Sequence, residues 1–360
     1  MKTGFDSQQP DQVTMDRFFR TFIYIIAIGG ITTAFFVVVA SPYIGALENN
    51  IAGQTATVAA PLNGVSGAAL SEHEEDEKAG IMIFVGDIML SRAIGKIITN
   101  INDPNYPFEY VKEYLKKADI LFGNLEGPIS GRGENQGSIY SFNADPTTAL
   151  GLTNAGFDVV SIANNHILDY GPQALLDTLV VLNAVGIEPI GGGIDYEHAH
   201  RGVIKTVGDT RIAFLAYTNL IPRFYGSEGA SPAVSFLDEN VMEHDIAAAK
   251  DVADIVVVTF HWGEEYETQH NSWQERIAKK AIDSGTSLVI GHHPHVVQEV
   301  EQYNGAFIAY SLGNFIFDQN FSEDTGKGLI FEATVKDKRV TQVKTIGISF
   351  NESFQPVLNN

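Results

Sequence analysis

The 360-residue chain contains no cysteine and few basic residues, and each shortage excludes a class of function. Without cysteine there is no disulfide, no thiol nucleophile and no cysteine-ligated zinc, so any metal site must use histidine, amide and carboxylate ligands. Lysine and arginine total 23 against 44 aspartate and glutamate residues, which gives a net charge of −21. Nucleic-acid binders need a basic face to neutralise phosphates, so we expect no nucleic-acid partner.

The remaining composition is that of a folded protein. Hydrophobic residues make up 44% of the chain, aromatic residues 10% and charged residues only 19%, which is sufficient for a buried core. No Gly-x-Ser-x-Gly elbow, P-loop or dinucleotide fingerprint occurs in the sequence. These absences argue against a serine hydrolase and against a nucleotidase of the Walker type.

One long hydrophobic run precedes the folded part. Residues 21–40 carry no charged side chain, and a helix of that length spans roughly 30 Å, enough for one membrane crossing. Basic residues precede the run and none follows it closely, so the positive-inside rule places residues 1–20 in the cytoplasm and the later domain outside the cell membrane. We therefore expect a single-pass anchor at residues 21–43 that contacts membrane lipid. A cleaved signal peptide is the alternative, although its apolar part is usually about 7–15 residues long.

The composition changes again after this run. Residues 44–78 are rich in small and polar residues and end in an acidic stretch, which is typical of a flexible linker. Residues 79–350 show strands alternating with helices, which predicts a layered α/β domain, and residues 351–360 are expected to form a tail. We predict strands at 81–86, 118–123, 157–163, 187–190, 203–207, 211–217, 255–260, 287–290, 306–311, 328–335 and 344–350, and helices at 172–185, 239–252 and 272–284.

Carboxylate, amide and imidazole side chains follow five of the predicted strands. In chain order the segments are GDIM (86–89), GNLE (123–126), ANNH (163–166), HWG (261–263) and GHHPH (291–295). In α/β folds ligands gather beyond the carboxyl ends of strands, so we expect these side chains to line one site. Mixed oxygen and nitrogen ligands suit Mn²⁺, Fe²⁺ or Zn²⁺. The sequence therefore predicts a divalent-metal centre.

These segments also carry a family resemblance. Their order, together with ANNHILDYG (163–171) and YSLGNFIFD (310–318), resembles the CapA family of capsule and poly-γ-glutamate synthesis proteins over roughly residues 80–320. The folded part of that family is similar to the calcineurin-like metallophosphoesterases. The resemblance implies a four-layer α/β/β/α sandwich with a site for two divalent ions. The metal ligands it implies are Asp87, Glu126, Asn165, His261, His293 and His295.

The resemblance also implies catalytic residues and shows one departure. His166 matches a histidine that contacts the substrate phosphate, and Asp169 could orient its ring or cap the helix that begins near residue 172. In the phosphoesterases a histidine follows the first aspartate by two positions, whereas this chain has Met89, a poor ligand for a hard cation. A single-metal site therefore stays open beside the two-metal one.

Further side chains are expected near the metal. His292 is expected to be structural. Ser311 and Asn314 follow an apolar strand and could either meet the substrate or shape a turn. The predicted substrate-binding residues are Asn124, Asn164, Ser311 and Asn314.

Two functions remain, and both belong to capsule or poly-γ-glutamate production at the cell membrane. The first is an anchored extracytoplasmic metallohydrolase that uses metal-activated water to cleave a phosphoester or amide bond in an envelope polymer or its precursor. The second is a non-catalytic accessory subunit that binds polymer or metal beside the membrane subunits of a polymer synthase. Met89 favours the second function, whereas the full set of remaining ligands favours the first.

Overall fold

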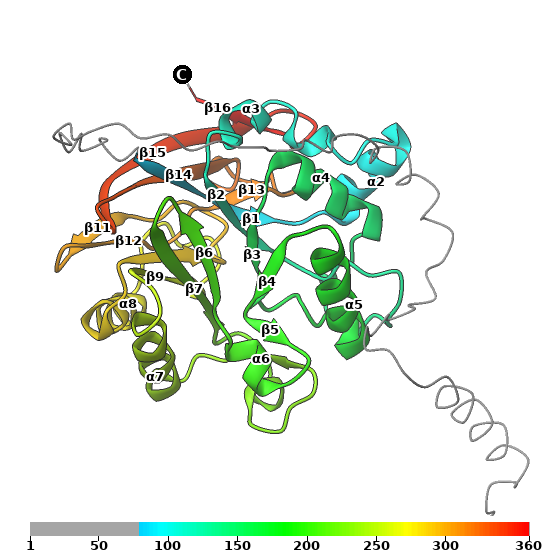
Figure 1. The fold of residues 1–360 in the computed structure, drawn as a ribbon. Coiled ribbons are helices and arrows are strands. Elements are labelled where there is room, and N and C mark those ends of the chain that lie inside the picture. Colours follow the sequence, from blue (N-terminus) through cyan, green and yellow to red (C-terminus); the bar gives the residue numbers. More distant parts are fainter. Residues whose placement is uncertain (1–78, 360) are drawn as a thin grey trace, which may run out of the picture. The chain divides into compact units, whose positions relative to one another are not determined.

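The computed structural model describes residues 79–359 of the chain (Figure 1). The expected cytoplasmic tail, membrane anchor and acidic linker lie outside these residues. Between residues 79 and 359, no helix has both the length and the apolar character needed to cross a bilayer. The described residues form a mixed α/β fold built on two large sheets.

The first sheet has eight strands in the order β16-β15-β14-β1-β2-β3-β4, and β13 also pairs with β1. Strands β1 to β4 are parallel, and β14 joins them antiparallel to β1. The last strand lies within the predicted tail at residues 351–360, so the sheet extends further along the chain than the sequence indicates. The bounds are β1 (Gly80–Ile88), β2 (Ile120–Leu125), β3 (Val159–Ser161), β4 (Glu188–Ile190), β13 (Asn314–Ile316), β14 (Lys327–Lys336), β15 (Arg339–Phe350) and β16 (Pro356–Leu358).

The second sheet has six strands in the order β11-β12-β10-β9-β7-β6. Its central strands β7, β9, β10 and β12 are parallel. A two-stranded sheet of β5 and β8 lies apart from both. The bounds are β5 (Gly192–Gly193), β6 (Val203–Val207), β7 (Thr210–Thr218), β8 (Ala233–Val234), β9 (Ile255–His261), β10 (Leu288–His292), β11 (Val300–Tyr303) and β12 (Ala306–Ala309).

Aromatic side chains from both large sheets form one core between them. The ring of Phe122 in β2 stacks on Phe214 in β7, with centroids 5.9 Å apart, and Phe84 in β1 lies 5.7 Å from Phe122. All three rings are fully buried. The near-continuous apolar run of β1 is explained by this position, because a central strand is covered on both faces.

Helices cover the outer faces of the two sheets. Figure 1 shows α7 and α8 side by side next to the second sheet, on the opposite side of the fold from α2, α4 and α5. The ends of α8 follow from its sequence: the side chain of Asn271 caps its first turn, and Gly285 ends it with φ 119°. The bounds are α2 (Arg92–Ile101), α3 (Lys112–Leu115), α4 (Ala149–Ala155), α5 (Gly171–Ala184), α6 (Tyr196–His200), α7 (Glu239–Lys250) and α8 (Ser272–Ser284), with 3₁₀ turns η2 (Tyr106–Phe108), η3 (Pro146–Thr148) and η4 (Arg223–Gly226).

Strand register brings the polar residues together. Asp87 near the end of β1 lies opposite Asn124 of β2, and His261 at the end of β9 lies opposite His292 of β10. Because these neighbouring strands are parallel, their carboxyl ends lie at the same edge of each sheet. The fold therefore places the predicted segments where the sequence analysis expects a shared site.

Candidate metal centre

Three of the predicted ligands form a compact buried cluster. One ligand atom from each of Asp87, Glu126 and His295 lies within 4.8 Å of the others. Nδ1 of His295 is 3.3 Å from Oδ2 of Asp87, and its Nε2 is 3.6 Å from Oε1 of Glu126. The first two residues come from the ends of β1 and β2, and His295 follows β10, so three separate segments supply the cluster.

The chemistry of this cluster fits a divalent cation. Neither carboxylate oxygen of Glu126 has a hydrogen-bond partner among the described residues, although the side chain is 1% exposed. A buried carboxylate without a partner is costly, and a cation is the partner that would remove the cost. Burial raises the pKa of Glu126 well above its ordinary range, an effect that the nearby His295 opposes. For Asp87 burial acts in the same direction, but contacts with His292 and His295 outweigh it and hold the pKa well below its usual value.

The other predicted ligands form a second group next to the first. Nε2 of His261 is 2.7 Å from Oδ1 of Asn165 and 3.1 Å from Nδ1 of His293. Nδ2 of Asn124 lies 2.8 Å from Oδ1 of Asp87 and 3.2 Å from Nδ1 of His261, so its amide joins the two groups.

The histidines of the two groups differ in charge. Burial lowers the pKa of His261 well below its ordinary value, and it lowers that of His293 to about 3. Burial also opposes the charged form of His295, but Glu126 and Asp87 outweigh it and raise its pKa to about 9. The neutral rings of His261 and His293 keep the lone pair that a metal ligand needs.

His166 and Asp169 form a pair beside the cluster. Nδ1 of His166 lies 2.7 Å from Oδ2 of Asp169, while its Nε2 is 3.7 Å from Oε1 of Glu126. The backbone amide of Phe142 donates to the same Asp169 oxygen at 2.8 Å, and the Phe142 ring packs 4.0 Å from the imidazole. Asp169 does not cap α5, because the helix begins after Tyr170 without a side-chain cap. Phe142 was not predicted to belong to the site, because its loop has no periodic hydrophobic pattern in the sequence.

The four predicted substrate-binding residues are buried and already have protein partners. Nδ2 of Asn164 donates to the carbonyl oxygen of Leu125 at 2.8 Å, and Oδ1 of Asn314 is 3.0 Å from Nδ1 of His295. The hydroxyl of Ser311 accepts from the backbone amide of Gly313 at 3.1 Å, which is a turn contact. Asn124 joins the ligand groups as described above. Their contact with substrate stays a prediction, and the structure shows them holding the site.

Met89, the last residue of the GDIM segment, and His292, which contacts Asp87 of the same segment, also lie at the site. The sulfur of Met89 accepts hydrogen bonds from the amide and the hydroxyl of Ser91, at 3.2 and 3.0 Å, and its side chain is fully buried. Nδ1 of His292 lies 3.4 Å from Oδ1 of Asp87, and neither ring nitrogen has a hydrogen-bond partner among residues 79–359. From the sequence we expect His292 to be structural, and the structure places its ring against the buried carboxylate of Asp87.

The rim of the site contains residues that the sequence analysis did not assign. Arg92, with φ 53°, pairs with Asp318 at 2.9 Å, and its guanidinium lies 5.4 Å from the ring centre of Phe142. Glu265 forms a second possible ligand group with His293 and His295. Glu264 and Glu265 directly follow the HWG segment, and this acidic pair is the sequence feature that could have drawn attention to Glu265. Nothing in the sequence indicates which of the two reaches the histidines.

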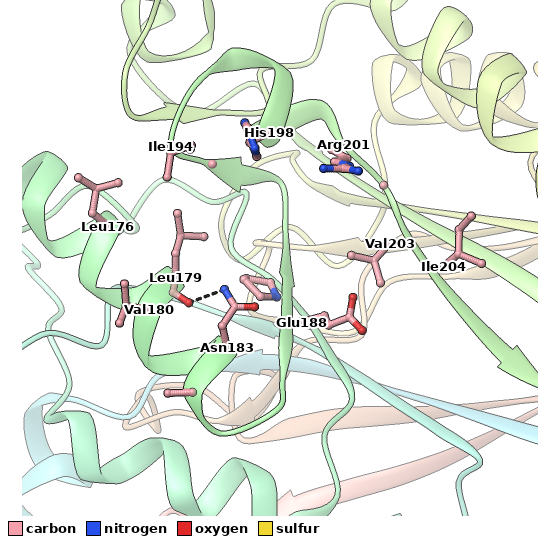
Figure 2. Close-up of a pocket in the computed structure, with 14 residues that line it drawn as sticks. Leu176, Leu179, Val180, Asn183, Glu188, Ile194, His198, Arg201, Val203 and Ile204 are labelled. Atoms are coloured by element: carbon pink, nitrogen blue, oxygen red, sulfur yellow. Dashed lines mark hydrogen bonds between the residues drawn. The ribbon is translucent and has the colours of Figure 1, made fainter. Parts of the chain in front are cut away.

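A pocket of about 1030 Å³ lies away from these residues (Figure 2). Figure 2 shows apolar side chains of α5, among them Leu176 and Leu179, on one side of it, and Val203 and Ile204 of β6 on the other. None of the predicted metal, catalytic or substrate-binding residues lines this pocket. The buried cluster is therefore a separate feature of the fold.

Comparison with known proteins relates the chain to capsule synthesis proteins. A family described as "Bacterial capsule synthesis protein PGA_cap" matches residues 81–319. The "Capsule biosynthesis protein CapA" of Bacillus anthracis is 33% identical over 267 residues, covering 72% of this chain and 64% of that protein. The "PGA biosynthesis protein CapA" of Bacillus subtilis is 33% identical over 250 residues, covering 69% of this chain and 66% of that protein. The chain thus spans slightly less than two thirds of the length of either relative.

Among solved structures, the fold is similar to a calcineurin-like phosphoesterase from Bacillus subtilis. The TM-score is 0.44 at 13% identity, and the alignment covers 75% of this chain and 90% of that one.

Proposed function

The chain belongs to the PGA_cap family of bacterial capsule synthesis proteins, and from this premise we propose that it is a divalent-metal-dependent hydrolase in capsule or poly-γ-glutamate production. The observation that carries the proposal is the buried Glu126 carboxylate, which faces Asp87 and His295 and whose two oxygens have no hydrogen-bond partner among residues 79–359. An arrangement of this kind is costly to a protein unless a cation is bound there.

The residues that would hold the cation fall into the two groups described above. Asp87, Glu126 and His295 supply two carboxylates and an imidazole, and the neighbouring group supplies an amide oxygen and two neutral imidazoles. A divalent cation bound there supplies Lewis acidity, which activates water at neutral pH and neutralises negative charge on the group that is cleaved. Oxygen and nitrogen ligands of these kinds suit Mn²⁺, Fe²⁺ or Zn²⁺.

His166 is placed to move a proton. The carboxylate of Asp169 accepts a hydrogen bond from Nδ1 of His166, which orients the ring so that Nε2 faces the carboxylate of Glu126. In the doubly protonated ring, Nε2 holds the proton that a leaving oxygen or nitrogen requires. Phe142 covers the ring and excludes water from one face. Oδ1 of Asn164 accepts a hydrogen bond from the backbone amide of His166 at 3.2 Å. The imidazole is thus held on several sides before substrate binds.

The substrate, location and partners are part of the same proposal. The substrate is a phosphoester or amide bond in an anionic envelope polymer or its precursor, and Arg92 on the rim is a cation that could meet its negative charge. The hydrophobic run at residues 21–43 anchors the protein so that the domain lies on the outer side of the cell membrane. Membrane subunits of a polymer synthase are the expected partners.

The test uses the purified 360-residue chain. Metal content is measured by elemental analysis after dialysis, and hydrolysis is followed with a phosphodiester and a γ-glutamyl peptide. We expect bound divalent metal and measurable turnover, with H166A losing turnover by about 10²- to 10⁴-fold while keeping its metal. H198A is the matched control, because His198 forms a similar pair with Asp195 at 2.7 Å on the exposed surface. Absence of bound metal, or equal turnover in H166A and wild type, would contradict the proposal.

A second function is favoured by Met89. Its sulfur is occupied by Ser91 and cannot serve as the ligand that the phosphoesterase pattern requires there. A protein with a reduced ligand set could bind an anionic polymer through a cation as an accessory subunit without cleaving it. In that case the full chain would bind γ-glutamate oligomers in a metal-dependent manner and show no turnover with either substrate.

A further inference from the structure

The loop after β9 brings an additional carboxylate to the metal centre. Ligand atoms of Glu265, His293 and His295 lie within 4.8 Å of one another, and Glu265 is exposed whereas both histidines are buried. His295 also belongs to the cluster with Asp87 and Glu126. Glu265 therefore lies on the solvent side of a ligand that the buried cluster already uses.

The protein holds this loop directly against the turn that carries the histidines. The backbone amide of Tyr266 donates to the carbonyl oxygen of Pro294 at 2.8 Å, and Pro294 lies between His293 and His295. Tyr266, His293 and His295 have φ values of 68°, 98° and 58°, a region that residues with side chains rarely adopt. Such conformations persist only where the surrounding structure enforces them, and they cluster at functional sites.

Glu265 lies in a ligand triad that overlaps the buried one. Asp87, Glu126 and His295 give three donors, whereas divalent ions in proteins commonly take four or more; Glu265 and His293 form the other triad, and His295 belongs to both. The sulfur of Met89, which occupies the position where another donor is expected, accepts two hydrogen bonds from Ser91 instead. The two oxygens of Glu126, which belongs to the buried triad, accept no hydrogen bond from any residue between 79 and 359, and a bound cation would satisfy them.

We propose that Glu265 is a ligand of the bound divalent cation and takes the place of the donor that is absent at Met89. This inference rests on the proposed metal dependence and adds a residue to the site. Its carboxylate would approach the cation from the exposed loop, whereas Asp87 and Glu126 are buried. Glu264, its neighbour, is also exposed but belongs to neither ligand group, so it provides a matched control.

The test is metal titration of the full chain by calorimetry, after chelation and dialysis, with Mn²⁺ and Zn²⁺ as separate probes. Loss of a residue that only supports a ligand typically weakens affinity about 10- to 100-fold, so we expect E265Q to weaken binding at least tenfold. E264Q should bind as wild type does, and thermal melts of the metal-free variants should agree, which shows that the fold is kept.

Three outcomes separate the inference from the proposed function. Weaker binding in E265Q but not in E264Q supports the inference. Wild-type binding in E265Q, together with lost binding in D87N, overturns the role of Glu265 and leaves the metal centre intact. A wild-type chain that binds neither ion overturns both.

Discussion

Nδ1 of His166 lies 2.7 Å from Oδ2 of Asp169, and the same carboxylate oxygen accepts the backbone amide of Phe142 at 2.8 Å. Asp169 therefore holds both the imidazole and the aromatic residue that covers it. The side chain is 6% exposed, so neither contact is strongly competed by water. This relationship makes Asp169 a positioning residue, which acts through His166.

Replacing Asp169 tests that role. We expect D169N to lower kcat about 10- to 100-fold with little change in KM, because the amide leaves the ring in place but no longer accepts its proton strongly. Steady-state kinetics of the full chain measures both constants. D195N is the control, because it alters the exposed pair with His198 and should leave kcat unchanged. An unchanged kcat in D169N would show that the pair is only structural.

Metal binding should also appear as thermal stability. A ligand that binds only the folded state at 100 times its Kd adds about 2.7 kcal/mol, so saturating Mn²⁺ should raise the Tm by about 5 °C. D87N removes a carboxylate of the cluster and should abolish this increase. Differential scanning fluorimetry with and without chelator measures both effects. A Tm that is independent of metal in the wild-type chain would speak against a bound cation.

Glu126 should affect stability with opposite signs in the two metal states. In the metal-free protein this buried carboxylate accepts no hydrogen bond from the described residues, and burial raises its pKa well above the ordinary range, so its charged form is costly. In chelated protein at pH 8 we therefore expect E126Q to raise the Tm by a few degrees, and in saturating Mn²⁺ to lower it below that of wild type. Melting curves in the two buffers provide the comparison, and a lower Tm for E126Q in both would show that the contacts of Glu126 with His166 and His295 already offset the cost of burying its charge.

The close approach of β1 to the residue that precedes β13 fixes the position of Asp87. A Cβ on Gly86 would lie 1.9 Å from the carbonyl oxygen of Gly313, which accepts the backbone amide of Asp87 at 3.0 Å. G86A should therefore lower the free energy of unfolding by about 3 kcal/mol and reduce bound metal. G326A is the control, because its new Cβ would meet no atom closer than 3.4 Å. Chemical denaturation measures the difference, and similar stability of the two variants would show that the strands can move apart.

Local patterns in the sequence were sufficient for much of the fold. The predicted strand at 203–207 and the predicted helix at 272–284 agree with β6 and α8 to the residue. The helix has an Asn271 cap, an apolar stripe and Gly285 directly after it, so residues next to the helix in the sequence determine where it begins and ends. By contrast, β16 lies in a segment expected to be a tail, because its pairing with β15 depends on a distant part of the chain.

The same distinction applies to the site. Asp87, Glu126 and His295 could be expected at one site because each lies at or after the end of a predicted strand, and the family resemblance implied that they share a metal ion. Glu265 could not, since it depends on the contact between Tyr266 and Pro294, which are 28 positions apart in the sequence. Phe142 likewise reaches His166 only through the folded loop. Long-range contacts of exposed loops leave no periodic pattern, so the structure was needed to find these residues.

The roles of Met89 and Glu265 lead to a test by rescue. If the carboxylate of Glu265 compensates for the donor missing at Met89, a histidine introduced at position 89 should restore Zn²⁺ affinity in the E265Q background, because imidazole is a good ligand for Zn²⁺. Calorimetric titration should show M89H/E265Q binding about tenfold more tightly than E265Q. M89L/E265Q is the control, since leucine fills the buried position of Met89 without adding a donor. If M89H/E265Q and M89L/E265Q bind equally weakly, position 89 does not face the cation and the compensation is refuted. If only the histidine variant recovers, the two positions serve the same coordination site.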